Sequence, residues 1–224
     1  MNLFIAAVLP VFAILVFYYM LDKFEPEPFK LLMRIFLFGC LTVAPILIVE
    51  TYLMNIAPYT GEALNLYHAF VVAGFTEEVF KWSVVYFVAF RNKEFNQKLD
   101  GIVYAVFASM GFAVIENIMY VMQNGMETAI LRGILSVPAH MFMGVIMGYY
   151  LSLARFNKRN RFVNIIKSIV YPIILHGIYD YILMSQFQLL LLLFIPFMIY
   201  TFFMVRKKVK EYYNLSKLDD EERL

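Results

Sequence analysis

The sequence predicts an all-α polytopic membrane protein that crosses the bilayer with about seven helices. Of its 224 residues, 62% are apolar and only 16% are charged, whereas soluble domains have about half apolar and about a quarter charged residues. The apolar residues form long continuous runs, and basic residues gather in every second connection between them. This composition excludes a cytosolic globular enzyme, a nucleic-acid binder and a disordered regulator.

Each apolar run approaches or exceeds the ~20 residues that a helix needs to cross the hydrocarbon of a membrane. The runs do not alternate between polar and apolar residues, as the strands of a membrane barrel do. The first run has no basic segment before it and no small-residue cleavage signal, so we interpret it as a retained helix rather than a signal peptide. The predicted spans are 3–21, 31–55, 66–90, 101–123, 134–154, 164–184 and 187–206.

The distribution of lysine and arginine predicts the orientation. Of the 19 such residues, all but Lys81 and Arg132 lie in or beside the connections after spans one, three and five, or in the C-terminal tail. Because basic residues concentrate on the cytoplasmic side of a membrane, the N-terminus is predicted outside and the C-terminus in the cytoplasm. The chain is then a bundle over 1–206 with an intramembrane site, followed by a cytoplasmic tail over 207–224. This tail is expected to be solvated, or else to bind a partner as a helix.

The third span contains two acidic residues and one basic residue near its middle. An ionisable side chain inside a bilayer is costly and usually marks a functional site or an ion pair. Lys81 follows Glu77 by four positions and Glu78 by three, so it can pair with either carboxylate on the helix surface. A structural Glu–Lys pair is one interpretation. Two carboxylates beside one lysine favour another, in which one is neutralised and the other is available for chemistry.

Three later spans carry polar residues at a similar predicted depth. The fourth contains Glu116 and Asn117, the fifth His140, and the sixth His176 with Asp180 four positions later. This last spacing allows Asp180 to orient the imidazole. Together with the double glutamate, these residues predict a polar cavity in the outer half of the membrane. Three further residues near outer ends are interpreted as interfacial or packing residues: Glu50, His68 and Arg132.

Two glutamates and two histidines suit the hydrolysis of an amide. Glu77 or Glu78 takes a proton from water, while His140 and His176 stabilise the tetrahedral oxyanion and help to protonate the leaving amine. The same four side chains match the donor set of a zinc hydrolase. No H-E-x-x-H or G-x-S-x-G stretch occurs, which disfavours the usual zinc helix and a serine nucleophile. The positive charge of Lys81 disfavours a dication, so no cofactor is preferred and zinc is the alternative.

Four motifs, in this order, resemble the PrsW family of bacterial intramembrane proteases and are distantly similar to CAAX-type prenyl proteases. They cover about 74–180: GFTEEVFKW, DGIVYAVFASMGFAVIENIMY, RGILSVPAHMFMGVIMGYY and HGIYD. The resemblance implies that Glu77, Glu78 and His176 carry activity, with His140 and Glu116 in supporting or catalytic positions. It also implies a multi-pass protein of the bacterial cell membrane that makes the site-1 cut in a single-span anti-sigma factor. That cut releases an extracytoplasmic-function sigma factor after further proteolysis.

The predicted function is therefore an intramembrane endopeptidase. Its predicted partners are the lipid bilayer and the membrane-anchored anti-sigma factor, with no nucleic acid. The alternative is a proton- or cation-coupled transporter in which the polar cluster forms a relay. A relay must continue to the inner face, and the spans hold no ionisable residue between Lys81 and the cytoplasmic boundary, which favours the protease. The predicted catalytic residues are Glu77, Glu78, His140 and His176, and the predicted supporting residues are Lys81, Glu116, Asn117 and Asp180.

Overall fold

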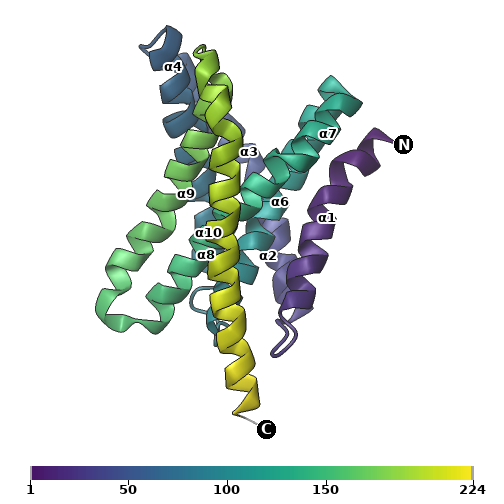
Figure 1. Ribbon diagram of the computed structural model, residues 1–224, viewed down its shortest axis with the longest axis vertical. Coiled ribbons are helices and arrows are strands. Elements are labelled where there is room, and N and C mark those ends of the chain that lie inside the picture. Colours follow the sequence, from purple (N-terminus) through teal and green to yellow (C-terminus); the bar gives the residue numbers. More distant parts are fainter. Residues whose placement is uncertain (1, 223–224) are drawn as a thin grey trace.

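The chain folds into a bundle of helices (Figure 1). The computed structural model describes residues 2–222, and no strand occurs among them. The all-α fold predicted from the sequence is confirmed. The elements are α1 (Leu3–Leu21), α2 (Phe29–Leu41), α3 (Val43–Asn55), α4 (Gly61–Tyr67), η1 (His68–Phe75), α5 (Thr76–Val88), α6 (Lys98–Asn124), α7 (Met126–Ile134), α8 (Ser136–Phe156), η2 (Lys158–Asn160), α9 (Arg161–Met184) and α10 (Gln188–Glu221).

Six helical segments within residues 2–222 are long and apolar enough to cross a membrane. The remaining predicted span, 66–90, corresponds to a continuous helical run over 61–88 that consists of α4, η1 and α5. The span predicted at 31–55 is also divided, since α2 ends at Leu41 and α3 begins at Val43. Pro45 lies in the first turn of α3, where its missing N–H costs little. The start of α1 and the end of α10 lie at opposite ends of the bundle, as an odd number of crossings requires (Figure 1).

The central helix of the bundle is α6, most of whose side chains are buried. It packs against α1, α2 and α8. Glycines permit this close approach: a Cβ on Gly148 would lie 2.1 Å from the carbonyl oxygen of Gly101, and one on Gly111 would lie 2.1 Å from that of Phe36. Small residues are the usual means of tight helix packing in membranes. The packing fixes the position of α6, which carries Glu116 in its last third.

The predicted tail begins as a continuation of α10. Most of its described residues are exposed, but one side of the helix packs on the bundle. Tyr212 is only 1% exposed, and its ring stacks on Tyr149 with 4.6 Å between centroids. Ser216 donates a hydrogen bond to the side chain of Gln97, the residue directly before α6 in the sequence. This part of the tail therefore belongs to the packed end of the bundle, while 223–224 lie outside the described residues. The side of the membrane on which it lies stays a prediction.

The connection between α1 and α2 packs against the first turns of α6. Asp22 Oδ2 accepts a hydrogen bond from the backbone N–H of Glu27 at 3.0 Å, and the Tyr104 hydroxyl donates to the Glu27 carboxylate. Burial is the largest influence on Glu27, and with the negative charge of Asp100 it raises the pKa of Glu27 to about 9. Glu27 therefore holds a proton at neutral pH, and its protonation is coupled to the packing of this connection on α6.

Candidate active site

The double glutamate lies in the first turn of α5, directly after the π-helical segment η1. Turns of π-helix are frequent at functional sites because they redirect side chains within a continuous helix. Here η1 packs closely on α9: a Cβ on Gly177 would lie 2.3 Å from the ring of Phe70, and one on Gly74 would lie 3.3 Å from the backbone nitrogen of Gly177. This close contact places His176, the neighbour of Gly177, beside the two glutamates.

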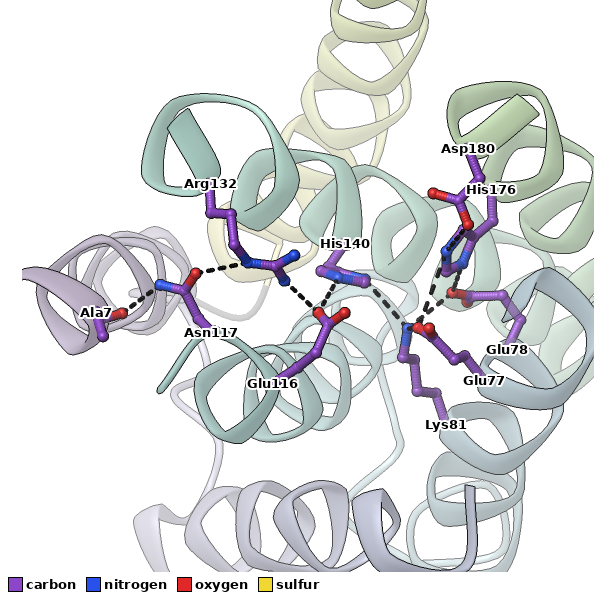
Figure 2. Close-up of polar contacts among 10 residues, drawn as sticks. All are labelled: Ala7, Glu77, Glu78, Lys81, Glu116, Asn117, Arg132, His140, His176 and Asp180. Carbon is purple, nitrogen blue, oxygen red and sulfur yellow. Dashed lines mark hydrogen bonds and ion pairs between the residues drawn. The ribbon is translucent and has the colours of Figure 1, made fainter. Parts of the chain in front are cut away.

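The ammonium of Lys81 lies at the centre of the site (Figure 2). Its Nζ is 2.9 Å from Glu77 Oε2, 2.9 Å from Glu78 Oε1 and 3.2 Å from His140 Nδ1. The ring of Phe112 covers it, with 4.0 Å between Nζ and the centroid. The predicted contacts along the helix are confirmed, but Lys81 holds both carboxylates instead of one. Glu78 and Lys81 are completely buried, whereas Glu77 is 6% exposed.

The imidazole of His176 is enclosed by carboxylates. Its Nδ1 lies 2.9 Å from Glu78 Oε1, and its Nε2 lies 3.3 Å from Asp180 Oδ2 and 3.9 Å from Glu77 Oε2. The contact between His176 and Asp180 that the spacing predicted is therefore present (Figure 2). A ring with protons on both nitrogens satisfies all of these contacts, since carboxylates only accept.

A second chain of contacts connects His140 to α7 and α1. Glu116 Oε2 lies 2.9 Å from His140 Nε2 and 2.5 Å from Arg132 Nη2. Arg132 Nε donates to Asn117 Oδ1 at 2.9 Å, and Asn117 Nδ2 donates to the carbonyl oxygen of Ala7 at 2.6 Å. Figure 2 shows this chain running from α1 to the imidazole. Asn117 therefore reaches the predicted catalytic residues through Arg132, without touching them itself.

A cavity of about 570 Å³ opens beside this cluster. Glu77 lines it, whereas the fully buried Glu78 does not. A polar cavity at the meeting point of the predicted site residues was expected from the sequence, and the structure contains one. That it opens toward the outside of the cell stays a prediction. Its polar and charged lining residues are Glu50, His68, Glu77, Glu116, Tyr120, Gln123, Arg132, Ser136, His140, His176, Tyr179 and Asp180.

Arg132 contributes to this site although the sequence interpretation left it out. We expected an interfacial or packing residue, but it bridges Glu116 and Asn117 from the short helix α7. Glu50 and His68, which received the same interpretation, line the cavity. A signal for Arg132 was present in the sequence, because it is the one basic residue on the predicted outer side, against the usual distribution.

The donor set of the cluster fits a zinc ion in number and chemistry. One donor atom from each of Glu77, Glu78, His140 and His176 lies within 4.8 Å of the others. Carboxylates and imidazoles are the donors found in many zinc hydrolases. Lys81, however, contacts three of these four residues. A metal ion bound among them therefore requires the ammonium to move away.

Fold and site together define a class of protein: a polytopic membrane protein with a buried glutamate–histidine centre suited to hydrolysis within the membrane. The family described as PrsW family intramembrane metalloprotease matches residues 27–205. Relatives named Protease PrsW are similar over most of their length. That of Halalkalibacterium halodurans is 36% identical over 93% of this chain and 96% of its own. That of Geobacillus kaustophilus is 40% identical over 83% of this chain and 81% of its own. That of Bacillus subtilis is 34% identical over 92% of this chain and 93% of its own.

The chain therefore belongs to the PrsW family of intramembrane proteases. It is a protease and a multi-pass bacterial membrane protein, which confirms the resemblance carried by the four motifs. Membership of a protease family favours hydrolysis over the transporter alternative. The family description also names a metalloprotease, in keeping with the donor set of the cluster. No solved structure matches the chain.

Proposed function

We propose that the chain makes the site-1 cut in a single-span membrane anti-sigma factor, near the outer boundary of the membrane. Further proteolysis then releases an extracytoplasmic-function sigma factor. The observation that carries the hydrolytic function is the position of Glu77, which lines the cavity within reach of an imidazole. The substrate class is supported by the motifs of the PrsW family and by the depth that the charge distribution predicts for the cavity.

Glu77 is the proposed base. Every hydrogen bond and ion pair that the Glu77 carboxylate forms within residues 2–222 uses Oε2, so Oε1 is the oxygen that accepts a proton from a water molecule in the cavity. The water oxygen attacks the carbonyl carbon of the scissile peptide as its proton moves to Glu77. Glu78 lies away from the cavity, and its proposed role is to hold Lys81 and His176 in place.

His176 is the proposed proton donor. The contacts of its Nε2 with Asp180 and Glu77 are long, at 3.3 and 3.9 Å, so this N–H is the one available to the developing oxyanion. When the C–N bond breaks, the proton passes to the leaving amine. The products are a new carboxyl terminus and a free amine. Asp180 keeps the ring in the orientation that this transfer needs.

His140 has both ring nitrogens in use. Because an ammonium only donates, Nδ1 of His140 accepts from Lys81 and Nε2 donates to Glu116. In this arrangement His140 acts as a positioning residue, whereas the sequence suggested direct contact with the oxyanion. Glu116, which is held by Arg132, fixes the imidazole, and the imidazole in turn fixes the ammonium between the glutamates.

Zinc is the alternative to this mechanism. Bound by Glu77, Glu78, His140 and His176, it would supply a Lewis acid for the scissile carbonyl. We prefer the glutamate mechanism because the ammonium of Lys81 repels a dication strongly in a low-dielectric site. Elemental analysis of the purified protein beside a His140→Ala, His176→Ala double variant distinguishes the two. Stoichiometric zinc in the parent and none in the variant, with activity restored to the chelated parent by zinc alone, would overturn our preference.

The direct test of the function is cleavage of a candidate anti-sigma factor by the purified protein in detergent, with and without chelator. Glu77→Gln and Glu78→Gln are each expected to lower cleavage by more than ~100-fold. Glu77→Gln loses the positioned base, and Glu78→Gln loses the carboxylate that holds Lys81 and His176 in place. Glu127→Gln is the matched control: it replaces an exposed acid of α7 that does not line the cavity, and it should cleave as the parent does. Full activity in both glutamate variants, at unchanged protein level, would refute the site.

A further inference from the structure

Glu50 differs from the other acidic residues of the cavity wall. The other three, which are Glu77, Glu116 and Asp180, each contact a cation or a histidine. Glu50 forms no hydrogen bond or ion pair with any residue of the described chain. It is half-buried on α3, and it lines the cavity. The four acidic residues that line the cavity are Glu50, Glu77, Glu116 and Asp180.

The position of Glu50 relates it to the reacting groups. It lines the same cavity as Glu77 and His176, and α3 packs against both η1 and α5. A carboxylate within the membrane is costly unless a partner satisfies it. Lys81 is already held by two glutamates, and no cation of residues 2–222 pairs with Glu50. A cation on a molecule that enters the cavity would supply such a partner.

We propose that Glu50 forms a subsite for a basic side chain of the substrate, a lysine or arginine close to the scissile bond. The inference rests on the proposed peptide hydrolysis. A guanidinium or ammonium supplies both the opposite charge and the hydrogen-bond donors that a carboxylate accepts. Ile46 and Leu47 line the cavity on the same helix, and they provide an apolar surface for the aliphatic stem of such a side chain. Arg132 also lines the cavity, but Glu116 already binds it.

The test uses one single-span substrate in which lysine, glutamine or glutamate is placed in turn at each residue flanking the cut. At one such position the parent should cleave the lysine form at least about tenfold more efficiently, in kcat/KM, than the glutamate form, a difference of about 1.4 kcal/mol. Glu50→Gln should remove this preference, and Glu50→Lys should reverse it. The control Glu127→Gln should keep it. A uniform loss of cleavage on all three substrate forms in Glu50→Gln would overturn the subsite.

A binding measurement keeps this inference separate from the proposed function. The inactive Glu77→Gln variant is titrated with the lysine and glutamate forms of the substrate peptide in detergent. We expect the lysine form to bind at least about tenfold more tightly, corresponding to about 1.4 kcal/mol, and the preference to vanish in a Glu50→Gln, Glu77→Gln double variant. Equal binding of the two forms to Glu77→Gln would refute the subsite even if the parent cleaves the substrate. A parent that binds selectively but does not cleave would refute only the proposed function.

Discussion

Lys81 offers a demanding test because three contacts of the site converge on its ammonium. Lys81→Met keeps an unbranched side chain, one atom shorter, and removes the charge. Glu77 and Glu78 would then be left in a buried site without the cation that now lies 2.9 Å from each. Removing one partner of a buried ion pair costs about 3–5 kcal/mol of unfolding free energy. For a chain of this size, that loss lowers Tm by roughly 6–20 °C.

Trp82 provides the assay for this variant. It is the single tryptophan of the chain, it follows Lys81 in α5, and its Nε1 donates to Ser168 of α9 at 2.9 Å. Its fluorescence therefore reports the separation of α5 from α9 during thermal unfolding in detergent. A Glu77→Gln, Lys81→Met double variant removes one charge of each sign. This double variant is expected to recover most of the lost stability and none of the cleavage.

Two results would refute this reasoning. A Lys81→Met variant as stable as the parent would show that the ammonium does not neutralise Glu77 and Glu78. Parent-level cleavage by Lys81→Met, with zinc bound in stoichiometric amount, would show that a metal takes the place of the ammonium. The first result concerns the electrostatics of the cluster and the second its catalytic type, so one set of samples tests both.

Three further predictions concern other parts of the bundle. Arg132→Gln loses the bridge to Glu116 and Asn117 and should lower kcat roughly 10–100-fold. Arg132→Lys should retain part of the activity. An unchanged kcat in Arg132→Gln would contradict a positioning role. Because the folded state raises the pKa of Glu27 from 4.5 to about 9, its protonated form favours folding, and this contribution is lost as pH rises from about 5 to about 9. Glu27→Gln should therefore flatten the fall of Tm over that range, and an equally steep fall would contradict the pKa. In a Cys40→Ser background, single cysteines should react with an impermeant reagent on intact cells at 59–62 and 185–188 but not at 93–96 and 157–160; the reverse pattern would invert the orientation.

Contacts along one helix were predictable from the sequence. The spacing of Glu77, Glu78 and Lys81 places them on one helical surface at i, i+3 and i, i+4, and the spacing of His176 and Asp180 does the same. Both sets of contacts are present in the structure. Helical geometry alone determines them, so no knowledge of neighbouring helices was needed. The apolar runs were equally informative, because the length of a membrane span depends on the thickness of the bilayer.

Contacts between helices were not predictable in the same way. In a soluble protein the apolar side of a helix shows which way it faces, but in a membrane the side facing lipid and the side facing the core are both apolar. The rotation of α8 about its axis, which brings His140 to Lys81, therefore left no pattern in the sequence. The close approach of α9 to η1, which depends on Gly177 and Gly74, was hidden for the same reason. Roles that depend on these contacts, such as the positioning role of His140, emerge only from the fold.

Arg132 shows how one observation supported two different inferences. Its isolation on the predicted outer side, away from the other connecting cations, served only as evidence for topology. The same isolation has an energetic meaning, since a lone cation near the bilayer is retained most easily where acceptors satisfy it. Glu116 and Asn117 are those acceptors, and through Glu116 the arginine reaches His140. Glu50 presents the complementary case, a carboxylate in the same cavity with which no cation of the described residues pairs. The pairing of Arg132 within the chain and the lack of a partner for Glu50 together favour a substrate that brings a positive charge into the site.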